Sequence, residues 1–142
     1  MKKTNILRVT ALILVAVMCF SLASCVKPYG TSDNAIIDLG DSDRFSRKEL
    51  EDAVECVKQK FKEFTGCNMT RIWYDEKLSE RELRGRNCMR YDNSVVLFSD
   101  FTTNKYAASE GFETDFEYTD WSWELVKNEN TSNWQVVSWG LG

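Results

Sequence analysis

A long uncharged stretch near the start of the chain limits how much of the sequence is left to fold. Lys2, Lys3 and Arg8 precede it, no charge occurs from position 9 to position 26, and positions 11 to 20 are apolar throughout. A short basic region followed by such a segment is typical of an export signal peptide. The rest of the 142 residues is enough for one domain.

The apolar stretch ends in Leu22-Ala23-Ser24-Cys25, a branched apolar residue, two small residues and a cysteine. This motif resembles the lipobox of bacterial lipoproteins, which implies diacylglycerol on the Cys25 thiol and cleavage between Ser24 and Cys25. An ordinary secreted protein or an uncleaved anchor helix is the alternative. Two or three acyl chains anchor a protein stably without a spanning helix. The expected location is therefore the extracytoplasmic face of the cell membrane, with the membrane as a partner.

Charge and composition exclude several classes of function. Of the 18 basic residues, 15 follow the leader, against all 22 acidic residues, so the mature part carries a net charge of −7. This balance opposes the neutralisation of phosphates, and we expect no nucleic-acid partner. No histidine occurs, which removes the commonest general base and the usual zinc ligand. No metal or other cofactor is predicted.

Residues 26 to 44 are rich in Gly, Ser and Asp around one short apolar patch at positions 36 to 39. This composition predicts a flexible tether that would hold a domain roughly 25 Å from the bilayer. The predicted organisation is a lipoprotein signal peptide at 1 to 24, a lipidated cysteine and tether at 25 to 44, and one domain at 45 to 142.

The clearest element of that domain begins with a capping box at Ser46-Arg47-Lys48-Glu49. Gly66 is the expected left-handed stop. Apolar residues between them recur at helical spacing and predict a helix with one buried stripe; they are Leu50, Ala53, Val54, Val57, Phe61 and Phe64.

Four strands are predicted after this helix, at 67 to 74, 94 to 99, 116 to 127 and 134 to 139. A brief second helix is expected near the Ser79-Glu80-Arg81-Glu82 capping pattern, with Leu83 facing the interior. Residues 102 to 115 are predicted to form a surface loop. The predicted fold class is α+β: one main helix packed on a curved, mostly antiparallel four-stranded sheet, in the order α-β-α-β-β-β.

This order resembles the nuclear-transport-factor-like and cystatin-like folds. A second likeness rests on Phe45-Ser46, Glu49-Leu50, Ala53-Val54, Gly66-Cys67, Trp73-Tyr74-Asp75-Glu76, Trp123, Trp134 and Trp139-Gly140. Those residues are similar to a group of small uncharacterised lipoproteins from anaerobic Gram-positive bacteria, over most of residues 45 to 140. The resemblance implies a compartment and a fold. It implies no activity, because that group has no established activity to carry over.

Tryptophans are the candidate ligand-binding residues: Trp73, Trp121, Trp134 and Trp139. Alternation along a strand puts Trp121 and Trp123 on one face. That face is either a platform for a sugar, a peptide or an apolar ligand, or the core under the helix, and we favour the core. Trp134 and Trp139 lie five positions apart, which predicts opposite faces.

Tyr74, Asp75 and Asp120 are the candidate catalytic residues. A carboxylate at the end of the first predicted strand could act as a general base, with Tyr74 as a proton donor. A charged helix cap at Asp75 explains the same residues, and we favour that interpretation.

Cys56, Cys67 and Cys88 remain after the leader and Cys25 are set aside. Because three is an odd number, at least one thiol is free or pairs between chains. We favour three free, packed thiols, with a Cys67–Cys88 disulfide as the alternative. The oligomeric state is left open.

The leading functional prediction is a membrane-anchored, non-catalytic binding or interaction module for a small ligand or an envelope protein. The alternatives are a small conical-fold hydrolase or isomerase using carboxylate and tyrosine, and an accessory or inhibitor protein that acts on an envelope partner. A pocket between the helix and the sheet, lined by two or more of the polar candidates, would favour the enzyme. A solid apolar interior would count against it.

Overall fold

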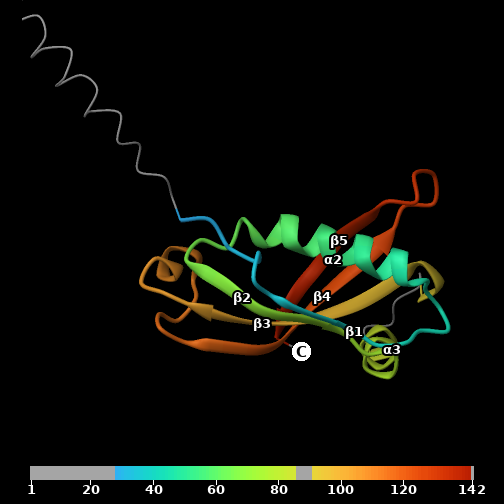
Figure 1. Ribbon diagram of the computed structural model, residues 1–142, viewed down its shortest axis with the longest axis horizontal. Helices are drawn as coiled ribbons and strands as arrows, with labels where there is room; N and C mark the ends of the chain where they lie inside the picture. The colour runs from blue at the N-terminus through green and yellow to red at the C-terminus, as the bar shows by residue number, and fades with distance from the viewer. Residues whose placement is uncertain (1–27, 86–90, 142) are drawn as a thin grey trace, which may run out of the picture.

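The computed structural model describes residues 28–85 and 91–141, shown as a ribbon in Figure 1. Its elements are β1 (Ile36–Leu39), α2 (Arg47–Phe61), β2 (Cys67–Tyr74), α3 (Glu76–Gly85), β3 (Ser94–Thr103), β4 (Glu117–Lys127) and β5 (Trp134–Leu141), with single 3-10 turns at Tyr91–Asn93 and Ala107–Glu110. The five strands form one sheet in the order β1-β2-β3-β4-β5. α2 packs on one face, here called the inner face, and α3 packs on the other, the outer face (Figure 1).

The predicted fold class is wrong in its details, although the arrangement is α+β. The sheet has five strands rather than four and is mixed, because β1 pairs in parallel with β2. The remaining pairs are antiparallel, and the described chain has two α-helices, α2 and α3. β1 lies within the stretch predicted to be tether. It has four residues, of which Leu39 alone is buried, so no alternation marked it as a strand.

The start and the buried face of α2 are as its sequence predicts. The Ser46 side chain accepts from the Glu49 N–H, and the Glu49 carboxylate accepts from the Ser46 N–H, which completes the capping box. The apolar stripe is buried against the sheet. The helix ends earlier than predicted, at Phe61 with Lys62 as its C-cap, so Gly66 does not stop the helix; at φ +74° it makes a left-handed turn directly before β2.

α3 begins four residues earlier than the capping pattern at Ser79 predicts, at Glu76 rather than Glu80. The Asp75 carboxylate accepts from the Leu78 N–H at 2.8 Å, which is the geometry of an N-cap. Ser79 is instead fully buried, and its hydroxyl accepts from the Val96 N–H on β3 at 2.9 Å. Leu83 is buried as predicted.

Irregular pairing re-aims several side chains along the last two strands. The β3–β4 register shifts between Ser99 and Phe101, beside Asp120 at φ +56°. The β4–β5 register shifts where Glu124 pairs with Ser138 but Leu125 pairs with Val136. A bulge of this kind changes which face the following residues occupy.

Among the described residues, no helix has the length and apolar character needed to cross a membrane.

Candidate functional site

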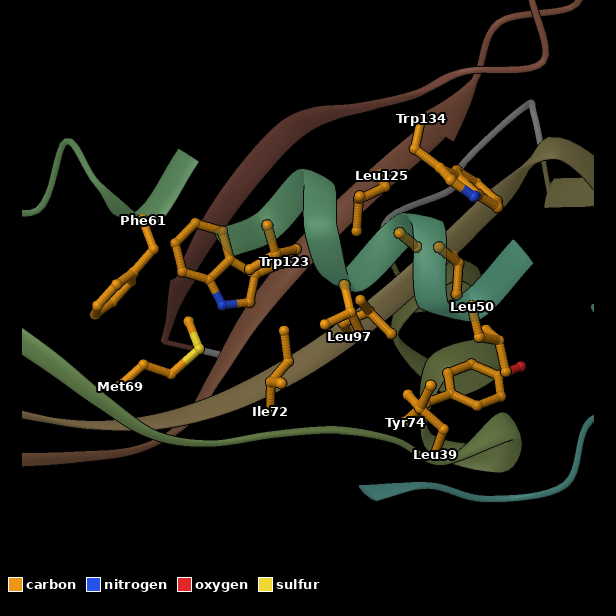
Figure 2. Packing of buried hydrophobic residues seen from close by; sticks show 14 of the residues in the cluster. Leu39, Leu50, Phe61, Met69, Ile72, Tyr74, Leu97, Trp123, Leu125 and Trp134 are labelled. Atoms are coloured by element: carbon orange, nitrogen blue, oxygen red, sulfur yellow. The ribbon is translucent and has the colours of Figure 1, made fainter. Parts of the chain in front are cut away.

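The space between α2 and the inner face of the sheet is filled by side chains. Figure 2 shows Phe61, Met69, Ile72 and Trp123 pointing into one apolar layer beneath α2, with Leu97 beside them; all five are fully buried. This layer occupies the place where the enzyme hypothesis required a pocket. The solid interior counts against the predicted carboxylate and tyrosine chemistry there.

Tyr74 belongs to this interior. Its hydroxyl lies 3.4 Å from the Ser42 Oγ and 3.4 Å from a Glu76 carboxylate oxygen. Burial raises the pKa of Tyr74 to about 12. A phenol with so high a pKa is a poor proton donor near neutral pH.

Ser42 and Glu76 fasten the segment that leads into α2. The Ser42 hydroxyl donates to the Glu76 carboxylate, which also accepts from the Asp43 N–H at 3.0 Å. The Phe45 N–H donates to the Ser42 Oγ at 3.1 Å. The Ser42 hydrogen bond is the main cause that lowers the pKa of the Glu76 carboxyl. This network has a structural role, because it holds the segment before α2 against the start of α3.

The structure separates the three candidate catalytic residues. Tyr74 is on the inner face, Asp75 caps α3, and Asp120 lies at the irregular start of β4, where its N–H donates to the Asp100 carboxylate at 3.0 Å. Asp75 therefore fits the helix-cap interpretation.

Two of the tryptophans are structural. Trp123 is fully buried, and its indole N–H donates to the buried Ser99 hydroxyl at 2.9 Å. The Trp134 indole N–H donates to the Glu49 carbonyl of α2 at 2.8 Å. Both rings therefore have the hydrogen bond that a buried indole requires.

Trp121 and Trp139 lie at the edge of the apolar layer beneath α2. Trp139 stacks near Trp123 with centroids 6.5 Å apart, and the Lys60 ammonium lies 4.4 Å from its ring centroid. Trp134 also packs under α2, so the prediction that Trp134 and Trp139 face opposite sides is wrong, because the β5 bulge restores the face of Trp139. Trp139 remains 43% exposed, and Trp121 is half-buried.

The fourth candidate, Trp73, lies on the outer face and lines a pocket with Asp120. This outer-face pocket has a volume of about 340 Å³ and is lined by Trp73, Leu78, Arg81, Glu82, Phe98, Thr119, Asp120 and Leu141. These residues come from β2, α3, β3, β4 and β5. The volume falls at the lower end of the range for small-molecule sites.

The aromatic wall of the outer-face pocket consists of two stacked rings. Trp73 and Phe98 stack with their centroids 4.6 Å apart and their planes at 23°. The Arg71 guanidinium lies 5.3 Å from the Trp73 centroid and donates to the Asp38 carboxylate at 2.7 Å. The Trp73 indole N–H is buried and has no hydrogen-bond partner among the described residues. An acceptor on a ligand that reached this N–H would remove the cost of leaving it unpaired.

Two other surface hollows have less of the character of a binding site. One, of about 430 Å³, borders α2 and β1. Four of its charged residues pair with each other, Arg47 with Glu51 at 3.3 Å and Lys48 with Asp52, as Arg81 and Glu82 of the outer-face pocket do at 3.7 Å. The other, of about 260 Å³, lies at the β4–β5 hairpin and has a mostly polar lining. Neither has an aromatic wall.

The cysteines divide between described and undescribed parts of the chain. Cys56 and Cys67 carry free thiols, and burial raises the pKa of Cys67 to about 11. A thiol with so high a pKa is largely protonated and unreactive at neutral pH. Cys25, the predicted lipidation site, and Cys88 lie outside the described residues.

Sequence reasoning named Trp73 and Asp120 for other reasons and missed the rest of the outer-face pocket. Phe98 was part of an apolar run and Arg81 part of a charged one, so neither carried a local signal for a site. Leu141 joins them only through the pairing of β5 with β4.

Comparisons of the chain with protein families, with curated proteins and with solved structures found no match.

Proposed function

We propose that this chain is a lipid-anchored, extracytoplasmic binding protein whose small ligand occupies the outer-face pocket, without catalysis. The main support for the proposal is the composition of this pocket. The stacked rings of Trp73 and Phe98 form one wall, and charged groups from α3 and β4 line the same hollow. An apolar wall with a few polar groups at the rim is the usual composition of a small-molecule site. The leader and the lipobox-like Cys25 support the proposed address.

The charges around the pocket indicate the class of ligand. Glu82 and Asp120 are carboxylates and Arg81 is a cation, so the lining carries one net negative charge. Carboxylates accept hydrogen bonds from hydroxyl and ammonium groups. The favoured ligand is therefore neutral or cationic, with one apolar face for the aromatic wall and several hydrogen-bond donors.

Three sugars of one ring size but different charge test this assignment: glucosamine, glucose and glucuronate. We expect glucosamine to move the amide and indole resonances of Trp73, Phe98 and Asp120 in a two-dimensional NMR titration, more than glucose does. Glucuronate should have the least effect, because the lining, with two carboxylates and one guanidinium, carries a net negative charge.

Asp120→Asn should reduce the preference for glucosamine over glucose, whereas the matched control Asp115→Asn, in the exposed loop, should leave it unchanged. An indole signal from Trp73 that responds to none of the three sugars would count against this ligand class at the pocket. The address has a separate test, since Cys25→Ser should abolish metabolic labelling with a fatty acid. Labelling that persists in that variant would overturn the proposed anchor.

A second candidate function is binding of an envelope protein along β5. This strand is an edge of the sheet, and it exposes Val137 at 48% and Leu141 at 65%. An exposed edge strand can pair with an extended segment of another chain. Crosslinking from position 137 on intact cells tests this, and recovery of no protein partner would count against it.

A further inference from the structure

Residues 28 to 31, which begin the described chain, are fixed to the body of the domain. Backbone hydrogen bonds run from the Gly30 N–H to the Lys62 carbonyl (3.2 Å), from the Gly66 N–H to the Pro28 carbonyl (3.0 Å), from the Thr31 N–H to the Cys67 carbonyl (3.0 Å) and from the Met69 N–H to the Thr31 carbonyl (2.8 Å). The Thr31 hydroxyl also donates to the Asn68 side chain at 2.7 Å. This segment therefore moves with the domain from Pro28 onward.

Close packing at Gly30 makes this attachment specific. A Cβ atom at Gly30 would lie 2.0 Å from the Phe61 carbonyl oxygen, at the end of α2. No real Cβ approaches a backbone atom so closely. The contact is backbone against backbone, and it brings the entering chain directly onto the turn between α2 and β2.

This geometry changes the distance between the proposed anchor and the domain. Three residue steps separate Cys25 from Pro28, and a fully extended chain covers at most roughly 10 Å in that length. The flexible tether predicted from composition would have allowed roughly 25 Å. A domain attached so closely cannot turn freely above the bilayer.

We propose that the end of the domain formed by residues 28–31, Lys62 and Lys105–Tyr106, here called the anchored end, rests on the lipid surface. This inference depends on the lipid anchor of the proposed function and adds an orientation to it. Figure 1 shows residues 28–31, the α2–β2 turn and the loop after β3 together at one end of the molecule. The Asn104 N–H donates to the Gly66 carbonyl at 2.9 Å and joins that loop to the turn.

Side chains on the anchored end suit a bilayer interface. Tyr29 is 65% exposed and Tyr106 is 48% exposed. The Lys105 ammonium lies 5.1 Å from the Tyr106 ring centroid, and Lys62 is exposed beside Tyr29's segment. Tyrosine rings concentrate at the headgroup level of membranes, and lysine extends its charge to the surface above an apolar stem.

Charge opposes this contact on one side. The loop beyond Tyr106 carries the exposed acids Glu110, Glu113 and Asp115, and an anionic leaflet repels acidic groups. We therefore expect the closest contact on a zwitterionic bilayer, with Tyr29 and Tyr106 nearest the lipid. Increasing the share of phosphatidylglycerol should move the acidic loop outward.

Paramagnetic NMR on the lipidated full-length mature protein tests the orientation. The protein would be placed in nanodiscs of phosphatidylcholine that contain a headgroup-chelated gadolinium lipid. We expect strong line broadening at Tyr29, Lys105 and Tyr106, and little at Asn130 on the β4–β5 hairpin, which lies at the opposite end (Figure 1). Broadening that is uniform, or strongest at Asn130, would overturn the proposal.

Variants separate the orientation from the anchor. An insertion of about 12 Gly and Ser residues after Lys27 adds roughly 20 Å of reach and should lower the broadening at Tyr106 to the level seen at Asn130. Tyr29→Glu with Tyr106→Glu should do the same, whereas Asn130→Glu should have no effect. Mass spectrometry of the same samples reports acylation of Cys25. Missing acylation refutes the proposed address and the orientation with it, while acylation with uniform broadening refutes the orientation alone.

Discussion

The inner and outer faces of the sheet are closed in different ways. On the inner face, α2 covers a continuous layer that includes Leu50, Val57, Phe61, Leu97 and Trp123. On the outer face, α3 covers a small buried cluster of Leu83, Val96 and Phe98, and leaves the outer-face pocket beside it. The larger helix therefore covers the main core, and the smaller helix borders the pocket of the proposed site.

The largest difference between the faces should appear on truncation of Phe61. Its ring contacts Phe64, Phe101 and Trp123, with centroids 5.2, 5.5 and 6.2 Å away. Phe61→Ala should lower the free energy of unfolding by about 3–5 kcal/mol, measured by urea titration with circular dichroism. If that variant does not fold, Phe61→Leu supplies a smaller measurable loss. Leu78→Ala, at the half-buried edge of the outer cluster, should cost much less, and equal losses would contradict the comparison.

Ser79→Ala tests how α3 is held on the outer face. The change leaves the buried Val96 N–H without its hydroxyl acceptor, which should cost about 1–3 kcal/mol. Hydrogen exchange of the Val96 amide should become faster. Thr114→Ala on the exposed loop is the control, and an unchanged exchange rate at Val96 would show that Ser79 does not protect it.

Glu49 joins α2 to the sheet through an ion pair with Lys127. The Lys127 hydrogen bond, followed by those from Ser46, lowers the pKa of Glu49 from 4.5 to about 2. Because the folded pKa is the lower one, this stabilisation is complete above about pH 4.5 and is lost as the pH falls towards 2. Glu49→Gln should cost about 1 kcal/mol at pH 7.

The difference between wild type and Glu49→Gln should shrink over that acidic range in thermal melts at a series of pH values. Glu51→Gln removes an exposed pair with Arg47 on the same helix and is the matched control. A Glu49 effect that stayed constant down to pH 2 would contradict the ion-pair explanation.

Trp73→Phe should have the smallest effect on stability. The change removes a buried N–H that has no partner among the described residues, which stabilises the variant, and it also removes one ring from the stack on Phe98, which destabilises it. The two effects oppose each other, so the free energy of unfolding should shift by less than about 0.5 kcal/mol, in either direction. Trp123→Phe is the inner-face counterpart and should be clearly destabilising, because it breaks the bond to Ser99. Similar losses for the two variants would mean that the faces do not differ in this way.

Local patterns in the sequence identified most of the elements. The capping box at Ser46 and the apolar stripe after it defined α2, and residues 67 to 74 form a strand with the predicted bounds. β1 was missed because a short edge strand with one buried side chain has no periodicity. Ser79 was misplaced because the same residue type serves as a helix cap and as an acceptor for a neighbouring strand.

The outer-face pocket is formed by contacts between residues that are distant in the sequence, and no local pattern predicts such contacts. The bulge in β5 set the face of Trp139, and irregular pairing beside Asp100 set the position of Asp120. Trp73 and Asp120 were both named from the sequence, yet only the pairing of β2 with β3 and of β3 with β4 brings them to one hollow.

The attachment of Thr31 to Cys67 and Met69 also determines when, during synthesis, the N-terminal segment can fold onto the domain. Under the proposed address, the leader must be cut within a few residues of a segment that the folded domain holds tightly. That segment cannot close until Met69 has emerged, 38 residues after Thr31. If the chain is exported while it is synthesised, at about 5–20 residues per second, these 38 residues take roughly 2–8 s to emerge. Lipid transfer and cleavage can take place in that interval. Under the proposed address, processing of the leader and folding of the domain would therefore overlap in time.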